Sequence, residues 1–351
     1  MALNSSGPIS LAGSTAGQSI AVELGQGATS QISLNDAAVR SLAGVASGAI
    51  TMPTNFWGKS AFSGTKKGIF GYGQTTTRVS ITNLVSNTGV VSGDTAGVGT
   101  IRNSLAACGY GGDKGIFGYG NNISNIKVSM TNLVSNTGVV STDTTGVGTV
   151  RAGLSACGYG GDKGIFGYGW NAGTKYSVTN KVSNTGVVSG DTAGVGTARE
   201  GSAACGFGGD KGIFGYGYST TRVSMTNLVS NTGVVSGDTT GVGTARYYAG
   251  ACGYGGDKGI FGYGLTTVAV SMTNLVSNTG VVSGDTTGTG TPRYTIAACG
   301  YGGDKGIFGY GYSTTRVSMT NLVSNTGVVS GDTTGVGTAR SDLAACGYSL
   351  S

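Results

Sequence analysis

The pattern of apolar and polar positions predicts short β-strands along most of the chain. In one representative stretch, small residues fill 295–299, an apolar run occupies 307–310, and apolar and polar residues alternate over 317–322. Short apolar runs and alternation with a period of two are typical of strands. Gly, Asp, Ser and Asn separate these runs at 302–306 and 324–327, which indicates tight hairpin turns. A fourth, outer strand is expected after the second turn.

This unit occurs six times. The string Lys-Gly-Ile-Phe-Gly-Tyr-Gly recurs at spacings of 47, 49, 48, 47 and 47 residues. Its copies begin at Lys67, Lys114, Lys163, Lys211, Lys258 and Lys305. A period of this length is too long for most helical repeats and suits one four-stranded blade of a β-propeller.

The two ends of the repeat array predict how it closes. The first copy begins at its second strand, whereas the last copy continues for one strand more, from Arg340 to Tyr348. The innermost strand that the first unit lacks is therefore present at the C-terminus, and pairing the two removes the open edges of the array. We expect an all-β fold, a six-bladed β-propeller over residues 61–351 closed by the C-terminal strand, behind a small mixed α/β segment at residues 1–60.

The repeat resembles the kelch type of propeller unit over residues 61–348. An Arg precedes a strand of small residues, and an apolar strand ends in glycines at 71–73, where kelch units have a Gly pair. Valines such as Val90 and Val91 stand where kelch units have Trp, and Pro292 before Arg293 matches a Pro-Arg pair of that family. The resemblance implies that ligands bind on the face formed by the loops between the second and third strands.

Residues 1–60 have a different sequence pattern from the repeats. Residues 18–24 alternate as a strand does, and 33–44 read as a short helix with Ser33 or Asn35 as its cap and Gly44 just past its end. A core this small is expected to dock on a partner or to oligomerise.

The same segment resembles the N-terminal motifs of tailed-bacteriophage virion proteins. The matching stretches are Ser-Ser-Gly-Pro-Ile-Ser-Leu at 5–11, Ser-Gly-Ala-Ile-Thr at 47–51 and Phe-Trp-Gly-Lys-Ser at 56–60. The resemblance implies attachment to other tail or baseplate proteins, with the protein located in the virion tail and assembled in the host cytoplasm.

Composition narrows the possible functions. Seventy glycines against three prolines fit a turn-rich β-protein, and the net charge of +6 comes without a basic run, so nothing points to nucleic acid. No apolar stretch approaches the roughly 18 residues of a membrane span, and no secretory signal opens the chain. The six cysteines fall one per repeat at the same place, so we expect them to be buried and reduced, without disulfides.

Catalytic chemistry is poorly represented. The chain has no histidine and only two glutamates, Glu23 and Glu200, so we expect no enzyme activity, no cofactor and no metal. The aspartates of the Gly-Gly-Asp-Lys turns are expected to hold those turns. The Asp of each Ser-Gly-Asp-Thr or Ser-Thr-Asp-Thr loop is expected to cap the loop, with calcium binding as the alternative. The Arg of each repeat is expected to bond loop carbonyls, with a ring of anion ligands at one mouth of the channel as the alternative.

The six copies differ from one another in two windows. One follows the second strand and the other follows the repeat Arg, and antiparallel topology places both at the same end of every blade. This variable face is rich in Tyr, Trp, Asn, Ser and Thr, residue types that make adaptable binding surfaces. The candidate ligand-binding residues are Gln74, Asn121, Asn122, Trp170, Asn171, Tyr176, Glu200, Tyr218, Tyr247, Tyr248, Tyr294, Tyr312 and Asp342.

We therefore expect a bacteriophage tail-fibre or receptor-binding protein that recognises a host-surface glycan or protein through the variable face, and that forms a homo-oligomer. A purely structural virion, decoration or baseplate component is the alternative. An enzyme acting on surface polysaccharide is disfavoured by the lack of histidine and the scarcity of carboxylates.

Overall fold

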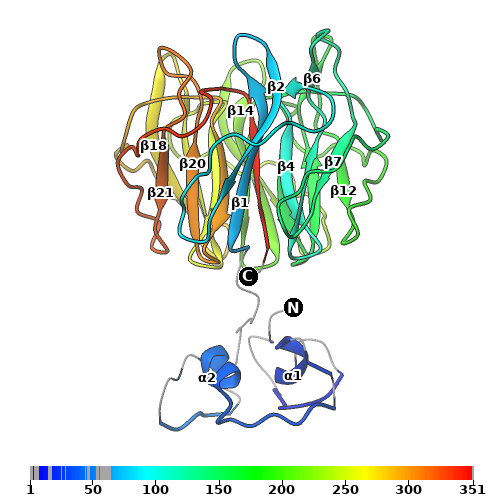
Figure 1. The fold of residues 1–351 in the computed structure, drawn as a ribbon, viewed down its shortest axis with the longest axis vertical. Helices are drawn as coiled ribbons and strands as arrows, with labels where there is room; N and C mark the ends of the chain where they lie inside the picture. Colours follow the sequence, from blue (N-terminus) through cyan, green and yellow to red (C-terminus); the bar gives the residue numbers. More distant parts are fainter. Residues whose placement is uncertain are drawn as a thin grey trace. The chain divides into compact units, whose positions relative to one another are not determined.

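The computed structural model describes residues 3, 8–14, 18–24, 26–27, 29–43, 45, 48–52, 55 and 65–349 of the 351-residue chain. The chain divides into two compact units, Met1–Ser63 and Gly64–Ser351 (Figure 1). Nearly all regular structure in the second unit consists of short antiparallel strands.

The described residues of the first unit form two short helices, α1 (Ile20–Glu23) and α2 (Ala37–Ala43), which pack Ile20, Val39 and Leu42 into a small apolar core. The strand predicted at 18–24 is wrong. The Ser19 side chain accepts a hydrogen bond from the Val22 N–H and so caps a helical turn. The turn also buries Ile20 and Ala21. The alternating pattern is compatible with burial of these residues in a strand or in a helical turn, so it does not distinguish the two.

The helix predicted at 33–44 exists but starts later than expected. Asp36 directly precedes α2 and its carbonyl accepts from the Arg40 N–H, whereas Ser33 and Asn35 lie in the turn before it. Neither predicted cap is therefore the residue at the helix start. Gly44 and part of the virion-type motifs, at 5–7, 47 and 56–60, lie outside the described residues.

The second unit contains six three-stranded antiparallel sheets, numbered here 1 to 6 in chain order. Each has a five-residue inner strand, a middle strand and an outer strand. In this order they are β22 (Ala344–Tyr348), β1 (Lys67–Gln74) and β2 (Arg78–Val85) in sheet 1; β4 (Ala106–Tyr110), β5 (Lys114–Gly118) and β7 (Thr131–Val134) in sheet 2; β8 (Ser155–Tyr159), β9 (Lys163–Gly167) and β12 (Thr179–Val182) in sheet 3; β13 (Ala203–Phe207), β14 (Lys211–Tyr218) and β15 (Arg222–Val229) in sheet 4; β16 (Gly250–Tyr254), β17 (Lys258–Leu265) and β18 (Ala269–Val276) in sheet 5; and β19 (Ala297–Tyr301), β20 (Lys305–Gly309) and β21 (Thr320–Val323) in sheet 6.

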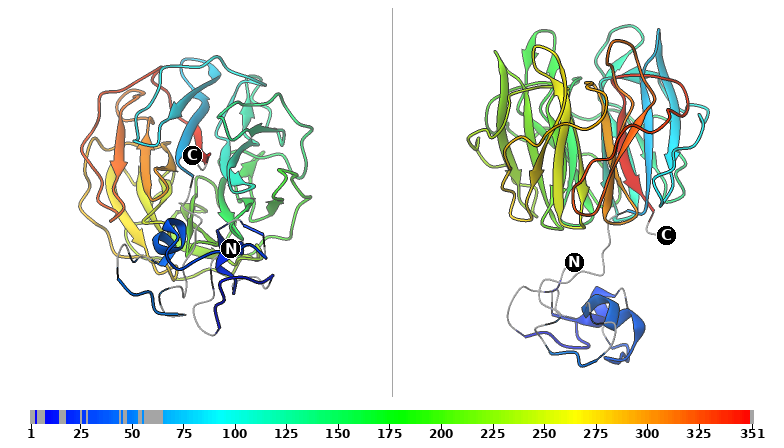
Figure 2. Two further views of the ribbon diagram at one scale, coloured as in Figure 1. Left: turned by 60° about the horizontal axis from the view of Figure 1, so that its bottom comes forward. Right: turned by 90° about the vertical axis from the view of Figure 1, so that its left-hand side faces the viewer.

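The predicted pairing of the C-terminal strand with the first repeat is confirmed. Strand β22 pairs antiparallel with β1 from Lys67↔Tyr348 to Gly71↔Ala344. The inner strands contact one another in the cyclic order β4, β8, β13, β16, β19, β22 and back to β4. Figure 2 shows the sheets arranged around a common axis in this order.

The predicted fourth strand does not form as a regular strand. In sheet 1 the segment after the outer turn makes only isolated bridges, at Val85↔Val91 and Thr82↔Thr95, and the other repeats carry matching valine bridges. Between these two bridges the Asn83 side-chain amide donates to the Ser92 carbonyl, and Ser92 Oγ accepts from the Leu84 N–H. Side chains thus replace part of the strand ladder, which explains why a strand pattern is weak there.

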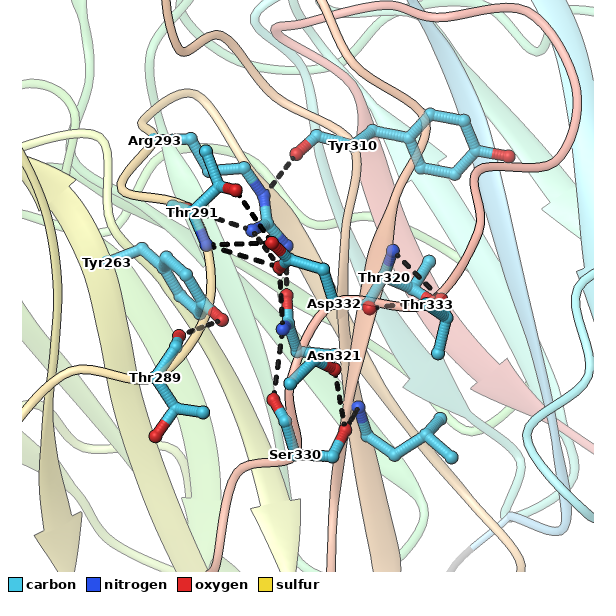
Figure 3. Close-up of polar contacts among 12 residues, drawn as sticks. Tyr263, Thr289, Thr291, Arg293, Tyr310, Thr320, Asn321, Ser330, Asp332 and Thr333 are labelled. Atoms are coloured by element: carbon cyan, nitrogen blue, oxygen red, sulfur yellow. Dashed lines mark hydrogen bonds and ion pairs between the residues drawn. The ribbon is translucent and has the colours of Figure 1, made fainter.

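A buried arginine holds each pair of neighbouring sheets together (Figure 3). The guanidinium of Arg293 stacks on the Tyr263 ring of sheet 5, 4.5 Å from the centroid, and donates to the Thr291 carbonyl at 3.1 Å. In sheet 6 it donates to the Asn321 side chain and lies 3.5 Å from Asp332. The prediction that these arginines bond loop carbonyls is confirmed. The alternative of exposed anion ligands is wrong, because the side chain of Arg293 and of each counterpart is 0% exposed.

The loop aspartates cap the same junctions, as predicted. Asp332 accepts from the Thr291 N–H and hydroxyl, at 2.9 and 2.6 Å. Partial burial alone would raise the pKa of the Asp332 carboxyl, but the hydrogen bonds from Thr291 and Asn321 outweigh it and hold the pKa below its ordinary value. At the junction between the last and first sheets, Arg340, Asp94 and Thr338 make the equivalent contacts.

The six cysteines are buried and free, as predicted. Each lies on an inner strand and faces a glycine of a neighbouring sheet; a Cβ built on Gly212 would lie 2.5 Å from Sγ of Cys157. Burial raises the pKa of Cys108 to about 12. These thiols therefore fill space near the axis, and the facing glycines make room for them.

Candidate functional site

The two variable windows meet at one end of every sheet, at the top of Figure 1. Backbone bridges join them directly: Gln74↔Ser341, Asn103↔Asn121, Ala152↔Trp170, Glu200↔Tyr218, Tyr247↔Leu265 and Tyr294↔Tyr312. The antiparallel topology expected for each repeat accounts for this placement. We define the variable face as residues 74–78, 121–127, 170–176, 218–222, 265–269 and 312–316 together with 103–105, 152–154, 200–202, 247–249, 294–296 and 341–343.

The opposite end is built from constant turns. The Asp113 carboxylate pairs with Lys114 Nζ at 2.6 Å and accepts from the Asn136 side chain at 3.1 Å. The Asp162 carbonyl accepts from the Gly111 N–H, which ties the turn of sheet 2 to that of sheet 3. The predicted turn-holding role of these aspartates is confirmed at these contacts.

A ring of backbone hydrogen bonds surrounds the axis at the variable face. The residue two positions after each repeat Arg donates its N–H to the carbonyl of the equivalent residue in the preceding sheet, at 2.7–3.1 Å. The six residues are Ser104, Gly153, Gly201, Tyr248, Thr295 and Asp342, and all have φ between 50° and 61°. Only two are glycines, and a β-branched Thr at positive φ is rare. Strained positions of this kind cluster at ligand sites in proteins.

The ring lines a cavity of about 90 Å³ on the axis. Leu105, Leu154, Ile296 and Leu343 supply its apolar lining, and Tyr248, Thr295 and Asp342 supply polar groups. Asp342 accepts from the Ser341 hydroxyl at 2.8 Å. Burial raises the pKa of the Asp342 carboxyl, with the Ser341 hydrogen bond and nearby Arg316 acting in the opposite direction. The cavity is thus lined by a carboxyl group that accepts a hydrogen bond from Ser341 beside the apolar side chains.

Aromatic rings gather beside this cavity. The rings of Tyr218 and Tyr247 lie 5.5 Å apart, and those of Tyr247 and Tyr248 lie 4.5 Å apart. On the adjacent side of the face, Tyr294 and Tyr312 lie 5.6 Å apart. These tilted pairs of aromatic rings are rigid and amphipathic, which suits them to contact the faces of a ligand.

All the predicted site residues lie on the variable face and are half-buried. The structure brings Glu200, Tyr218, Tyr247 and Tyr248 into one cluster, and places Asp342 and Tyr248 in the cavity lining. The others are spread around the rim: Gln74 bonds Asn103, Asn121 and Asn122 form strand β6, Trp170 and Asn171 form strand β10, and Tyr176 donates its N–H to the Gly169 carbonyl.

One set of functional candidates is missing from the sequence prediction. The residue four positions before the Thr-Asn pair of each third strand is basic in five of the six repeats: Arg78, Lys127, Lys175, Arg222 and Arg316, with Ala269 in the fifth. Lys127 Nζ lies 4.2 Å from the Trp170 ring centroid, Lys175 Nζ lies 4.8 Å from that of Tyr218, and Arg222 Cζ lies 5.4 Å from that of Tyr247. Alignment of the repeats with one another would have revealed this position.

No protein-family model matches the chain, and no curated protein shows significant similarity to it. Within the described residues, neither helix has the length and apolar character needed to cross a bilayer. The described residues also contain no cluster of three or more His, Cys, Asp or Glu side chains placed to hold a metal ion.

Proposed function

We propose that the six sheets are the blades of a six-bladed β-propeller, with the C-terminal strand completing the first blade. The cyclic order of inner-strand contacts supports this architecture. So does the equivalence of the junctions, because Arg340 and Asp94 repeat across the seam the contacts that Arg293 and Asp332 make within the chain.

We further propose that the protein is a receptor-binding or tail-fibre component of a bacteriophage virion, which recognises a host-surface glycan or protein through its variable face. The observation that carries the proposal is that the sequence differences between the repeats are confined to one end of the sheets. Repeats that are otherwise nearly identical differ at one end only, and there they present aromatic pairs around a cavity. Drift in surface loops would not favour one end.

In this proposal, residues 1–60 attach the protein to other tail or baseplate proteins, on the strength of their resemblance to virion motifs. The protein acts as a homo-oligomer, without catalysis, cofactor or nucleic acid. A propeller that only joins virion subunits is the competing function, and it requires no ligand on the variable face.

The test is adsorption of the fluorescently labelled full chain to a panel of bacterial strains and to a bacterial glycan array. Replacing Trp170, Tyr218, Tyr247 and Tyr294 together by Ala is expected to abolish binding and leave the circular dichroism spectrum unchanged. A matched control replaces four valines outside the variable face by Ala. They are Val90, Val187, Val234 and Val281, which are 62–67% exposed. Binding that survives the aromatic substitutions would favour the structural role.

A further inference from the structure

The variable face holds an excess of positive charge. Five cations lie there, Arg78, Lys127, Lys175, Arg222 and Arg316, against two carboxylates, Glu200 and Asp342. The difference of three charges is half of the net charge of +6. The other three positive charges come from Lys66, Lys67 and Lys181, outside the variable face, and the remaining repeated Arg, Lys and Asp residues balance one another.

Charges elsewhere in the repeats are neutralised in pairs. Each of the six buried arginines lies 3.5–3.9 Å from a loop aspartate, and five turn lysines lie 2.6–3.1 Å from the preceding aspartate. On the variable face only Lys175 has such a partner, Glu200 at 3.6 Å, among the residues described from 65 to 349. The other four cations are therefore available to an anion from outside the chain.

These cations are held in place before any ligand arrives. Three of them stack on aromatic rings that come next in the order of sheets. These pairs are Lys127 on Trp170, Lys175 on Tyr218 and Arg222 on Tyr247. Arg78 donates to the Asn103 and Asn125 side chains of the neighbouring sheet. Because the side chains are already ordered, an anion that binds them loses less conformational entropy than it would on free lysines and arginines.

The axial cavity inside this ring of cations has the opposite preference. A volume of about 90 Å³ holds roughly three water molecules, which matches a small hydroxyl-bearing group and not a folded protein surface. The Asp342 carboxylate accepts hydrogen bonds from hydroxyl groups but repels a phosphate or carboxylate. The centre of the face therefore selects an uncharged polar group, and its rim selects negative charge.

We propose that the ligand of the variable face is an acidic saccharide, with a small hydroxyl-bearing group of one sugar unit in the axial cavity and the anionic groups of the chain against the five cations. This inference rests on the proposed function and specifies its ligand class. Sugar rings present hydroxyls at their edges and apolar C–H groups on their faces, which suit Asp342 and Tyr248 respectively. A nucleic acid satisfies the rim equally well, but its phosphates meet Asp342 at the centre.

The chain itself provides a conservative variant for the test. Ala269 occupies the cation position in the fifth repeat, so this fold accepts Ala there. We would measure binding of the full chain to polygalacturonate, to neutral dextran and to single-stranded DNA by biolayer interferometry. The variants are Arg222→Ala with Arg316→Ala, the complementary Ala269→Arg, and a control at the constant turns, Lys211→Ala with Lys258→Ala, which removes the same charge.

Wild-type protein is expected to bind polygalacturonate and not dextran. The paired Arg variant should weaken this binding about 4- to 25-fold, Ala269→Arg should strengthen it about 2- to 5-fold, and the lysine control should leave it unchanged. Asp342→Asn keeps a side chain that tolerates positive φ and should weaken binding to polygalacturonate without strengthening binding to dextran.

Equal losses in the arginine and lysine variants would overturn the inference, because they would indicate a nonspecific charge effect. Tighter binding to DNA than to polygalacturonate would overturn it in favour of a nucleic acid. If cell adsorption depends on Trp170 and Tyr218 but not on Arg222 and Arg316, the proposed function stands and the saccharide class is wrong. If adsorption depends on none of them, the proposed function itself fails.

Discussion

The junction between the last and first sheets offers the sharpest test of the fold, through the substitution Asp94→Asn. Asp94 Oδ2 accepts from the Thr338 N–H and hydroxyl, at 3.0 and 2.6 Å, and Oδ1 accepts from the Asn83 side chain at 2.9 Å. Thr338 lies 244 residues from Asp94 in the sequence, and the Arg340 guanidinium is 3.9 Å away from the Asp94 carboxylate. An Asn side chain has only one acceptor oxygen, so in either orientation its amide faces a donor.

The magnitude follows from the bonds that are lost. A hydrogen bond to a charged group contributes about 1.5–3 kcal/mol, and the Asp94 side chain is 30% exposed. We expect a loss of about 2–3 kcal/mol in the free energy of unfolding, equivalent to a fall in Tm of about 4–6 °C for a domain of this size. The assay is thermal and urea unfolding of the full chain, followed by circular dichroism.

Asp285→Asn is the matched control at a junction within the chain. Asp285 accepts from Thr244 and Asn274 at distances of 2.6–3.2 Å and lies 3.8 Å from Arg246. If the ring of sheets closes, the two variants lose equal stability to within about 0.5 kcal/mol. An unchanged Tm for Asp94→Asn beside a lowered Tm for Asp285→Asn would refute the closure.

Three further predictions concern stability and reactivity. The six loop carboxylates have pKa values held below their ordinary range. The stability that they contribute is therefore complete above about pH 4 and is lost as the pH falls through their folded pKa values. Tm should be steady from pH 7 to 5 and fall below pH 4, and a flat profile down to pH 3 would contradict this. In Gly212→Ala the new Cβ would lie 2.5 Å from Cys157 Sγ, so this variant should lose about 1–3 kcal/mol in unfolding free energy. The control Gly237→Ala, where the new Cβ has no atom within 4 Å, should lose little. Equal losses would show that the Gly–Cys packing is not tight. Burial raises the pKa of Cys205 to about 12, so no thiol should react with a disulfide reagent at pH 8 until the chain unfolds; fast labelling of native protein would be inconsistent with this core.

Much of the repeat could be read from the sequence because its turns and strands carry strong local signals. The order of strands, the pairing of β22 with β1 and the placement of both variable windows at one end follow from periodicity and antiparallel topology. For the repeat arginines the sequence left two alternatives, bonding to loop carbonyls or a ring of anion ligands. The first is favoured because a charge buried so deeply requires many hydrogen-bond acceptors.

Other features depend on tertiary contacts that no local pattern encodes. The segment 18–24 has the alternation of a strand, yet the Ser19 cap and the small apolar core produce a helix. The ladder of the predicted fourth strand is partly replaced by hydrogen bonds from side chains such as Asn83. At the site, the positive φ of Thr295 and Asp342 arises from hydrogen bonds between different repeats, and so it is not visible in any single repeat.

The most direct test of binding by the variable face is hydrogen–deuterium exchange of the full chain, with and without bound cell-surface polysaccharide from a strain that the protein adsorbs to. We expect slower exchange in peptides that span 102–105, 170–176, 218–222 and 247–249, since these segments surround the cavity and the aromatic clusters. Slower exchange confined to the constant turns at 111–114 and 135–139 would contradict the account and place the binding surface at the opposite end.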